Sequence, residues 1–600
     1  MSGALLAGAL GAAAPLEGQE QACVRGVVEE IVVRNGTVVP EEDIPDGILG
    51  WGPRLANRLH IRTRKSFIRA ELLLDEGDCY DPFLVEDSER ILRRYGFISN
   101  AEVFAVRIDT DTEADAAASE ARWRIEVETR DEWSTRLEIT AEFDNGFQLR
   151  SAALAETNVL GLGATLRGFL VEDDAQRLLG AQAGLPRLFG TRANLAGSWG
   201  TTRIGEFRAV EVSYPFVGEV GHWAWQVGAS DVEDYFSYSF GETGAPARVL
   251  LPTRDQSASA TIARRFGEPG DLSVVGLNLA RETLDFPGYP DAVDIVEGNG
   301  FDETVTAPAD LAEALRAQTR FGAGTRLSVL LGQRNISFVQ RTGLDALRGV
   351  QDIEVGTDIS LTLGRTIRGG IGERDVDDLL VRFRWYGATA PTPWVVVSRI
   401  SLQGRQIFFD PEFDRSGWRD VLAEFDLLAY WQPPSLPSHT VLGRVSATGG
   451  WTVDLPYQLT LGGRRAVRGF DDADLPGARR VVFTAEDRIY FGWPFPETFD
   501  LGATLFADVG RIWPGGVPFG VDSGWRGTVG AGLRFGFPTG SRGVIRLDLA
   551  HAIGPEASAN GPILRITAVD LIGLTGGLSD LQLLRSIRIG TGVDRFTPAR

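Results

Sequence analysis

Alternation of apolar and polar residues at every second position is the feature that most constrains the fold of this chain. Val544–Leu549 reads Val-Ile-Arg-Leu-Asp-Leu, and the same period recurs over Leu327–Leu331, Asp358–Leu363 and Thr528–Phe535. A period of two places apolar side chains on one face of an extended strand and polar side chains on the other. From Leu137 onward we therefore predict a succession of β-strands.

The connections between these strands distinguish a membrane barrel from a soluble β-sandwich, which alternates in the same way. Short turns are expected at 186–190, 214–221, 267–271, 388–393, 432–439 and 538–543, whereas Pro287–Thr319 is a long polar loop. Tryptophans gather near the ends of the runs, at Trp223, Trp225, Trp385, Trp394, Trp431, Trp451 and Trp493. Short turns at one end, long loops at the other and interfacial aromatic residues are typical of outer-membrane barrels.

Composition agrees with a mainly β fold. The 72 glycines and 43% apolar residues favour many short strands joined by turns. After Leu16 no uncharged apolar run reaches the roughly 18 residues that a membrane helix needs, and a mean hydropathy of -0.05 suits strands whose two faces average out. We count about fifteen strands before residue 460 and about five after it, an even total that returns both chain ends to the periplasmic side. We predict one closed antiparallel transmembrane barrel of 16–20 strands over residues 134–600.

Charge and residue inventory exclude several classes of function. The net charge of -21 argues against nucleic-acid binding, which needs a basic patch, and the excess of acids is interpreted as solubility and loop solvation. The chain has only four histidines, no clustered spacing of metal ligands and no Gly-x-Ser-x-Gly nucleophile motif. We therefore expect neither an enzyme nor a cofactor or metal site.

The first 133 residues have a different organisation. Residues 1–22 contain a short apolar run ending in an Ala-x-Ala-like site, typical of a signal-peptide remnant without its basic start, or are disordered. From residue 23 to residue 133 we expect strands at Val27–Val33, Val103–Ile108 and Trp123–Val127, and helices over Lys65–Leu74 and from Pro82 to Gly96, the second capped by Asp81. The order β-α-α-β-β predicts a small soluble α+β domain.

Both cysteines, Cys23 and Cys79, lie in this N-terminal part. An oxidising periplasm would let them pair, and the sequence leaves open whether they do. A bridge would close a loop of about 55 residues and contribute on the order of 4 kcal/mol through the entropy of the unfolded chain.

The segment Leu461–Phe470 carries a glycine-rich motif whose residues are Gly462, Gly463, Val467, Arg468, Gly469 and Phe470. Downstream, Val481–Phe491 contains Glu486, and Phe506-Ala507-Asp508-Val509-Gly510 reads F-x-D-x-G. Together these segments resemble the loop motif, the barrel-wall acid and the strand motif of the BamA/TamA superfamily of outer-membrane assembly and polypeptide-transport proteins.

The strand period independently assigns both acids to the lumen. Glu486 shares a strand face with Thr484, and Asp508 shares one with Phe506. A loop near residues 455–480 that folds back into the barrel could place Arg468 between the two carboxylates with charge-assisted hydrogen bonds. The alternative is that Arg468, Glu486 and Asp508 are ordinary charges of the lumen, and in either case their role is structural.

The resemblance extends upstream of the barrel. Arg64–Arg94 resembles a polypeptide-transport-associated (POTRA) domain, Thr129–Ser134 resembles the family's entry into the barrel, and Glu156–Gly161 resembles its first periplasmic turn. The chain departs from the best-known members in having one POTRA-like domain, at 23–133, and a strand count nearer twenty than sixteen.

The resemblance implies an outer-membrane protein that inserts or translocates polypeptides, with its N-terminal domain in the periplasm. Its partners would be the outer-membrane bilayer, client polypeptides and a periplasmic partner at the POTRA-like domain. The alternative is a passive porin or surface antigen on the same scaffold, which a steady open conductance would distinguish. Two segments compete as the last strand, Ile563–Leu571 and Ser586–Phe596.

Overall fold

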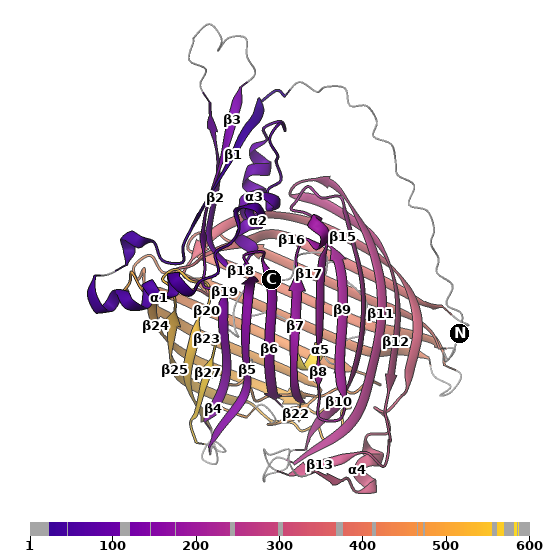
Figure 1. The fold of residues 1–600 in the computed structure, drawn as a ribbon. Coiled ribbons are helices and arrows are strands. Elements are labelled where there is room, and N and C mark those ends of the chain that lie inside the picture. Colours follow the sequence, from indigo (N-terminus) through magenta and orange to yellow (C-terminus); the bar gives the residue numbers. More distant parts are fainter. Residues whose placement is uncertain are drawn as a thin grey trace.

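A computed structural model shows a β-barrel with a small α/β unit at one end (Figure 1). The structure describes residues 23–44, 46–108, 121–143, 146–173, 176–240, 247–297, 304–367, 376–410, 416–464, 466–471, 474–554, 561–568, 581–584 and 586. The signal-peptide remnant expected at 1–22 lies outside these residues.

The barrel wall is built from strands that follow one another around the ring. In chain order they are β4 (Thr135–Phe143), β5 (Phe147–Val159), β6 (Ala164–Asp173), β7 (Gln176–Leu185), β8 (Asn194–Thr201), β9 (Glu206–Tyr214), β10 (Trp223–Phe240), β11 (Ala247–Glu268), β12 (Asp271–Asp285), β15 (Gly322–Thr342), β16 (Val350–Ile367), β17 (Asp377–Thr389), β18 (Trp394–Phe409), β19 (Gly417–Trp431), β20 (His439–Trp451), β23 (Arg479–Tyr490), β24 (Asp500–Trp513), β25 (Arg526–Gly536), β26 (Ile545–Ile553) and β27 (Ile563–Thr567).

These twenty strands form a closed antiparallel sheet in which β27 pairs with β4. Fifteen of them precede residue 460 and five follow it, as the alternation predicted. The short strands β13 (Asp294–Glu297) and β14 (Thr304–Thr306) form a side hairpin on β11, because β12 pairs directly with β15. The predicted closed barrel is confirmed, at the upper end of the expected strand number.

The two faces of the wall have the predicted polarity. On β12, Val275, Leu277 and Leu279 are exposed on the outside, whereas Asn278 and Glu282 are buried on the inside. Exposed tryptophans mark both rims: Trp223, Trp394, Trp431 and Trp493 lie at one, and Trp199, Trp418, Trp451 and Trp525 at the other. An apolar belt between aromatic girdles is the surface that a barrel presents to lipid.

The short and long connections also separate as predicted. All six predicted turns lie at the barrel end that carries the N-terminal unit, which we call the turn end. The opposite end, the loop end, carries the longest external connection, between β12 and β15, which contains β13, β14 and the helix α4 (Ala309–Ala314). Figure 1 shows the N-terminal unit and α4 at opposite ends of the barrel.

The N-terminal unit contains a three-stranded sheet in the order β1-β3-β2. Its strands are β1 (Val27–Gly36), β2 (Ile98–Arg107) and β3 (Arg122–Asp131), with β1 parallel and β2 antiparallel to β3. The helices α2 (Lys65–Glu71) and α3 (Pro82–Arg94) contribute Phe67, Ile68, Val85 and Leu92 to a core with Ile125 and Val127 of the sheet. Asp81 caps α3 through Phe83 N, at 3.0 Å, as expected from the Asp-Pro pair.

The predicted β-α-α-β-β order was incomplete. A third helix, α1 (Trp51–Leu59), follows two short 3-10 turns, Glu41–Asp43 and Gly47–Gly50, between β1 and α2. Pro53 falls in the first turn of α1, where a proline interrupts no helical hydrogen bond. None of the described helices is long and apolar enough to cross a membrane.

Cys23 and Cys79 form a disulfide in this unit. It joins the entry to β1 to the segment before α3, across 56 positions of sequence. The pairing that the sequence left open is therefore present. The chain-entropy model assigns a closed loop of this length on the order of 4 kcal/mol of stabilisation.

Arginines from the barrel turns attach the N-terminal unit by binding the carboxyl ends of its helices. Arg187 and Arg192, between β7 and β8, donate to Ala70 O at the end of α2, at 2.8 and 3.3 Å. Arg542, between β25 and β26, donates to Arg93 O and Tyr95 O at the end of α3. Cations at the carboxyl ends of helices satisfy unpaired carbonyls and favour the helix dipole.

Candidate functional site

The candidate site begins with two carboxylates on the lumen face of the wall. Glu486 lies midway along β23 and Asp508 lies on the neighbouring β24, and both are almost fully buried. Thr484 shares their face and donates to Asp508 Oδ1 at 2.9 Å. The period-two argument placed these side chains in the lumen, where the structure has them.

A long loop from β20 to β23, residues 452–478, folds into the lumen and brings Arg468 to both acids. We call it the motif loop. The Nε and Nη2 atoms of Arg468 donate to Asp508 at 2.8 and 2.9 Å, and Nη1 donates to Glu486 at 2.7 Å. The guanidinium also lies over the ring of Phe506, 3.6 Å from its centroid. One planar cation therefore bridges two strands of the wall, as the fork geometry of arginine allows.

An apolar cluster holds the rest of the motif loop. The short strands β21 (Leu459–Thr460) and β22 (Pro476–Gly477) form a small hairpin inside the barrel. Buried side chains of the loop pack with wall residues in a cluster that contains Tyr457, Leu459, Leu461, Val467, Phe470, Val482 and Ile512. Burial of this much apolar surface fixes the loop in the lumen independently of the ion pairs.

Glycines let the motif loop approach the wall closely. A Cβ on Gly469 would lie 2.8 Å from Ala552 N, and one on Gly510 of β24 would lie 2.8 Å from the Val467 side chain. In the loop itself, Gly462 forms an isolated bridge with Val467, and Gly463 has a φ of 124°. Each motif glycine thus stands where a larger residue would push the loop away or strain its backbone.

Glu486 is the centre of a wider charge network. It accepts from Arg488 at 3.0 Å and from Arg546 at 3.3 Å in addition to Arg468. Arg488 continues to Asp345, at 3.0 Å, in the connection between β15 and β16 at the turn end. The ion pairs therefore run without a break from the motif loop to the turn end of the lumen.

Arg565 of β27 is a member of the site that sequence reasoning missed. It pairs with Glu142 of β4, so it joins the last strand to the first. Its other nitrogens donate to Arg468 O and, at 3.0 Å, to Phe470 O. Arg150 of β5 also binds Glu142, at 3.0 Å. The motif loop is thereby tied directly to the strand pair that closes the barrel.

That closing pair, which we call the seam, is short. Leu564–Thr567 of β27 pairs with Thr140–Phe143 of β4, and Ala568 N donates to Ile139 O at 3.2 Å. Within the described part of the chain, the remaining half of β4, residues 135–138, has no strand partner on this side. By contrast, β10 and β11 pair over the whole of Trp223–Phe240.

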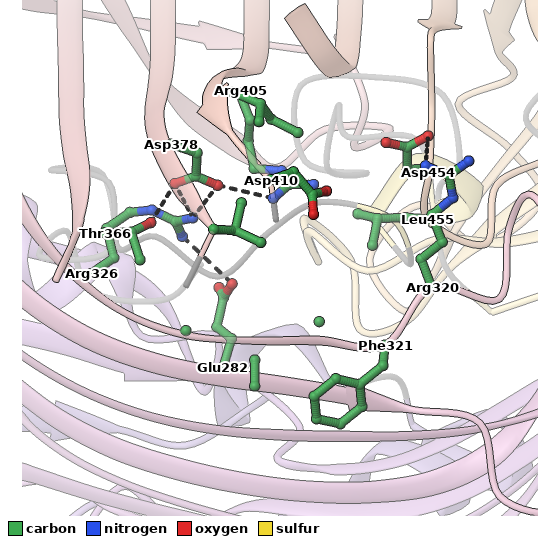
Figure 2. Close-up of a pocket in the computed structure, with 15 residues that line it drawn as sticks. Glu282, Arg320, Phe321, Arg326, Thr366, Asp378, Arg405, Asp410, Asp454 and Leu455 are labelled. Atoms are coloured by element: carbon green, nitrogen blue, oxygen red, sulfur yellow. Dashed lines mark hydrogen bonds and ion pairs between the residues drawn. The ribbon is translucent and has the colours of Figure 1, made fainter. Parts of the chain in front are cut away.

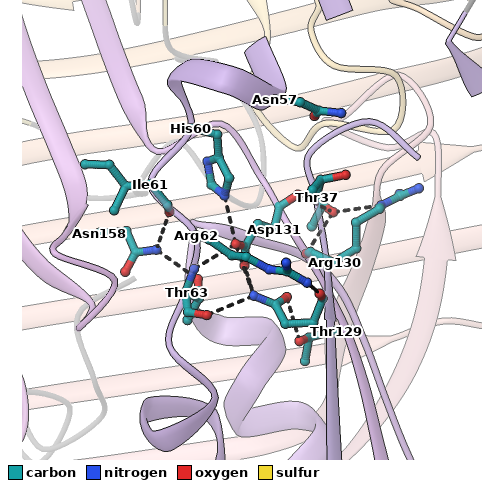
Figure 3. Close-up of polar contacts among 12 residues, drawn as sticks. Thr37, Asn57, His60, Ile61, Arg62, Thr63, Thr129, Arg130, Asp131 and Asn158 are labelled. Atoms are coloured by element: carbon teal, nitrogen blue, oxygen red, sulfur yellow. Dashed lines mark hydrogen bonds and ion pairs between the residues drawn. The ribbon is translucent and has the colours of Figure 1, made fainter. Parts of the chain in front are cut away.

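A buried polar junction joins the N-terminal unit to the first turn of the barrel (Figure 3). Asp131, at the end of β3, accepts from His60 Nε2 and Thr63 N, both at 2.8 Å. Asn158, near the end of β5, donates to Thr63 Oγ1 at 2.8 Å and Ile61 O at 3.2 Å. Because these groups are buried, each hydrogen bond constrains how the unit sits on the turn end.

At the loop end, ion pairs around a small pocket of charged and apolar side chains fix the base of the motif loop (Figure 2). Asp378 of β17 accepts from Arg326 at 3.0 Å and from Arg405 at 2.9 Å. Arg405 pairs in turn with Asp420, which accepts from the loop's Asp454 N at 2.8 Å. These contacts hold the start of the motif loop at the loop end of the barrel.

Among the described residues, no group of three or more His, Cys, Asp or Glu is arranged to hold a metal ion. The buried carboxylates of the site instead have arginine partners. What this arrangement can do is mechanical: it joins a loop, a wall and a strand seam through hydrogen bonds of two arginines, Arg468 and Arg565.

Comparison with known proteins finds similarity only among solved structures. No family model and no curated protein matches the chain. BamA from Haemophilus ducreyi lacking POTRA domains 1–3 is 13% identical, with a TM-score of 0.36 over 90% of this chain and 84% of that one. CdiB from Acinetobacter baumannii is 12% identical, with a TM-score of 0.37 over 90% and 73%. CdiB from Escherichia coli is 11% identical, with a TM-score of 0.35 over 92% of both chains.

BamA and CdiB are structural neighbours of this chain. At these identities the similarity concerns the fold alone. Any functional assignment therefore depends on this chain's own residues, above all on the contacts of Arg468 and Arg565.

Proposed function

We propose that this protein is an outer-membrane barrel that inserts or translocates polypeptides, and that it works by opening the seam between β27 and β4. The observation that carries the proposal is Arg565, which bonds the first strand and the motif loop at once. Release of the loop would remove two acceptors from Arg565 and weaken the seam. A strand edge opened in this way is a template for an incoming strand.

The short pairing of the seam supports this role. The free energy of strand pairing grows with the number of cross-strand pairs, so the five-residue β27 is the easiest place to part the wall. The lumen offers less for passive diffusion, because the motif loop and its arginine network occupy it. This occupancy favours a polypeptide-handling protein over the porin alternative.

We propose further that the N-terminal unit is a periplasmic POTRA domain. The outer edge of β2 is guarded near the barrel, where Glu89 accepts from Val103 N and Arg93 donates to Ala101 O. Farther along, Phe104 and Val106 are exposed on the strand. An extended client segment could add to this outer half by backbone hydrogen bonds, as in other cases of strand addition. The same surface would serve a periplasmic partner.

A reversible lock on the seam tests the proposal. Ala141→Cys and Ile566→Cys occupy paired positions of β4 and β27, and Leu277→Cys with Val329→Cys is a matched control pair between β12 and β15. Both pairs are made in a background with Cys23 and Cys79 replaced by alanine, in which heat-modifiable gel migration reports barrel closure.

The readout is the folding of a urea-unfolded eight-stranded outer-membrane protein into liposomes that contain the purified chain. We expect the chain to accelerate folding, the seam lock to abolish the acceleration until reductant is added, and the control lock to have no effect. Equal rates with and without the chain, together with a steady ion conductance, would instead establish the porin.

A further inference from the structure

The chain continues beyond β27, the last strand of the wall. After Thr567, the last residue of β27, the structure describes the short helix α5 (Leu581–Leu584) and Ser586, which lie in the lumen against the motif loop. Figure 1 shows α5 within the outline of the barrel. The alternative last strand at Ser586–Phe596 is not what Ser586 forms, and residues 587–600 lie outside the described part.

Gln582 of α5 makes a two-way contact with Thr460 of β21. Its Oε1 accepts from Thr460 N at 2.9 Å, and its Nε2 donates to Thr460 Oγ1 at 2.7 Å. Arg480 of β23 adds a longer contact to Oε1, at 3.4 Å. A side-chain amide is a donor and an acceptor in one group, so it matches this pair of loop atoms.

Side chains of β23 and α5 complete the hydrogen bonding of the Thr460 backbone. Thr460 is opposite Pro476 in β22, and proline has no N–H to donate. Arg480 instead donates to Thr460 O, and Gln582 accepts from Thr460 N. Thr460 is 4% exposed, so both of its backbone polar groups are paired with side chains in a buried position.

Two further residues complete the contact. Leu583 is 2% exposed and belongs to the same apolar cluster as Leu461 and Val467 of the motif loop. Ser586 donates to Pro456 O, nearer the start of the loop. The amide of Gln582, the side chain of Leu583 and the hydroxyl of Ser586 thus each contact a chemically matching group of the motif loop.

We propose that the inner face of the motif loop is a peptide-binding site, and that the C-terminal segment of this chain is its resident ligand. The ligand class is a short peptide with a glutamine, an adjoining leucine and a hydroxyl four positions after the glutamine. The inference is independent of what the barrel transports, because it concerns only the fit between α5 and the loop.

The length of α5 makes this ligand exchangeable. A helix of four residues does not form by itself in water, so α5 is stabilised by the site and by its covalent attachment to β27. A short tether supplies an effective concentration on the order of millimolar. A segment of similar pattern that enters the lumen at comparable concentration would displace it, and the motif loop would then bind that segment.

A truncated chain ending at Ala568 tests the site directly. The chain is refolded into liposomes, heat-modifiable migration verifies the barrel, and the probe is a fluorescent synthetic peptide with the sequence of residues 578–590. We expect saturable binding by anisotropy. Leu583→Asp in the peptide should abolish binding, and Gln582→Ala should weaken it roughly thirtyfold, the ratio for two lost hydrogen bonds of typical strength.

The full-length chain is the matched comparison, because its own segment already fills the site. It should bind the labelled peptide at least tenfold more weakly than the truncated chain does. If the truncated barrel fails to close, full-length chain carrying Leu583→Asp replaces it, since this variant retains every wall strand and should also bind the peptide. We call the truncated chain and the Leu583→Asp chain vacated, because neither fills the site with its own segment. The proposal is overturned if vacated and wild-type chains bind the peptide equally, or if wild-type and Leu583→Asp peptides bind equally. It is also overturned if a closed vacated barrel binds no peptide.

Discussion

Replacing Arg468 by alanine should weaken the docking of the motif loop while leaving the barrel wall intact. The side chain supplies three hydrogen bonds of 2.7–2.9 Å to Asp508 and Glu486. Glu486 retains two other arginines, whereas Asp508 retains the hydroxyl of Thr484 and a backbone N–H 3.3 Å away. The loss therefore falls mainly on Asp508, a buried carboxylate left without its cation.

The expected magnitude follows from that uncompensated charge. Removing one partner of a buried ion pair costs about 3–5 kcal/mol. Since no strand ladder is touched, this cost reduces the free energy of loop docking and not that of barrel closure. At about 1.4 kcal/mol per factor of ten, even the lower value raises the undocked population roughly a hundredfold. Function should accordingly fall more than global stability.

Hydrogen exchange measured by mass spectrometry separates the two effects. Peptides from the motif loop should lose protection by roughly a hundredfold in Arg468→Ala, while peptides from β15 and β16 should be unchanged. Arg468→Lys should rescue poorly, because an ammonium cannot bridge two acceptors with a planar fork. Arg444→Ala is the matched control, since it removes a buried pair with Asp426, at 2.8 Å, between wall strands. Wild-type loop protection in Arg468→Ala, or equal loss in the control, would refute the reasoning.

Three other predictions concern the seam, the junction and pH. Arg565→Ala should lower the free energy of opening the seam by about 2–4 kcal/mol, because Glu142 and two loop carbonyls lose a buried donor. Disulfide formation between cysteines at positions 141 and 566 should then become less complete. Unchanged cross-linking would contradict this. Asp131→Ala should leave the hydrogen bonds of His60 and Thr63 unmade, so limited proteolysis should release the N-terminal unit from a barrel that still shifts on gels; Glu128→Ala, on the same strand, should release none. A hydrogen bond from Arg69, and next to it one from Ile31 N, lowers the pKa of Glu76 below its usual 4.5, so the stability that Glu76 contributes to the folded unit is present above pH 4.5 and is lost as the pH falls through the lower folded pKa. In that lower pH range the hydrogen-exchange rate of the Ile31 amide, corrected for the intrinsic rate, should rise in wild type. Glu76→Gln should remove this pH dependence.

The alternation of apolar and polar residues was enough to predict most of the barrel. The number of strands follows from counting the alternating runs. The lumen position of Glu486 and Asp508 follows from the period of two, because every second residue of a strand points to the same face. The approach of Arg468 to both acids also depended on a family resemblance, because the alternation does not indicate that the loop turns inward. The need for the motif glycines becomes clear only from the barrel wall next to them, because a Cβ on Gly469 would lie too close to Ala552 N.

Other features could not be predicted because their causes are distant in sequence. Arg565 lies in a strand of five residues, too short for alternation to identify, and its partners in the loop and in β4 lie 95 or more positions away. The helix α5 is held by Thr460 and Pro456, more than a hundred positions upstream. The helix α1 was not predicted, and its Gly52 and Pro53 are residues of low helix propensity that a helix tolerates best in its first turn.

The way in which the ring closes has a consequence for the order of folding. Glu142 and Arg565 meet across 423 positions of sequence, whereas most neighbouring strands form hairpins. Bringing such distant segments together costs about 3 kcal/mol more entropy than closing a hairpin of about 20 residues. Closure is therefore the slow final step of wall formation, and until then β4 waits as an unpaired edge at risk of aggregation. The N-terminal unit is synthesised first, and Arg136 of β4 donates to its Gly96 O at 2.6 Å, so the unit stays beside the turn end of that edge while the rest of the wall is made.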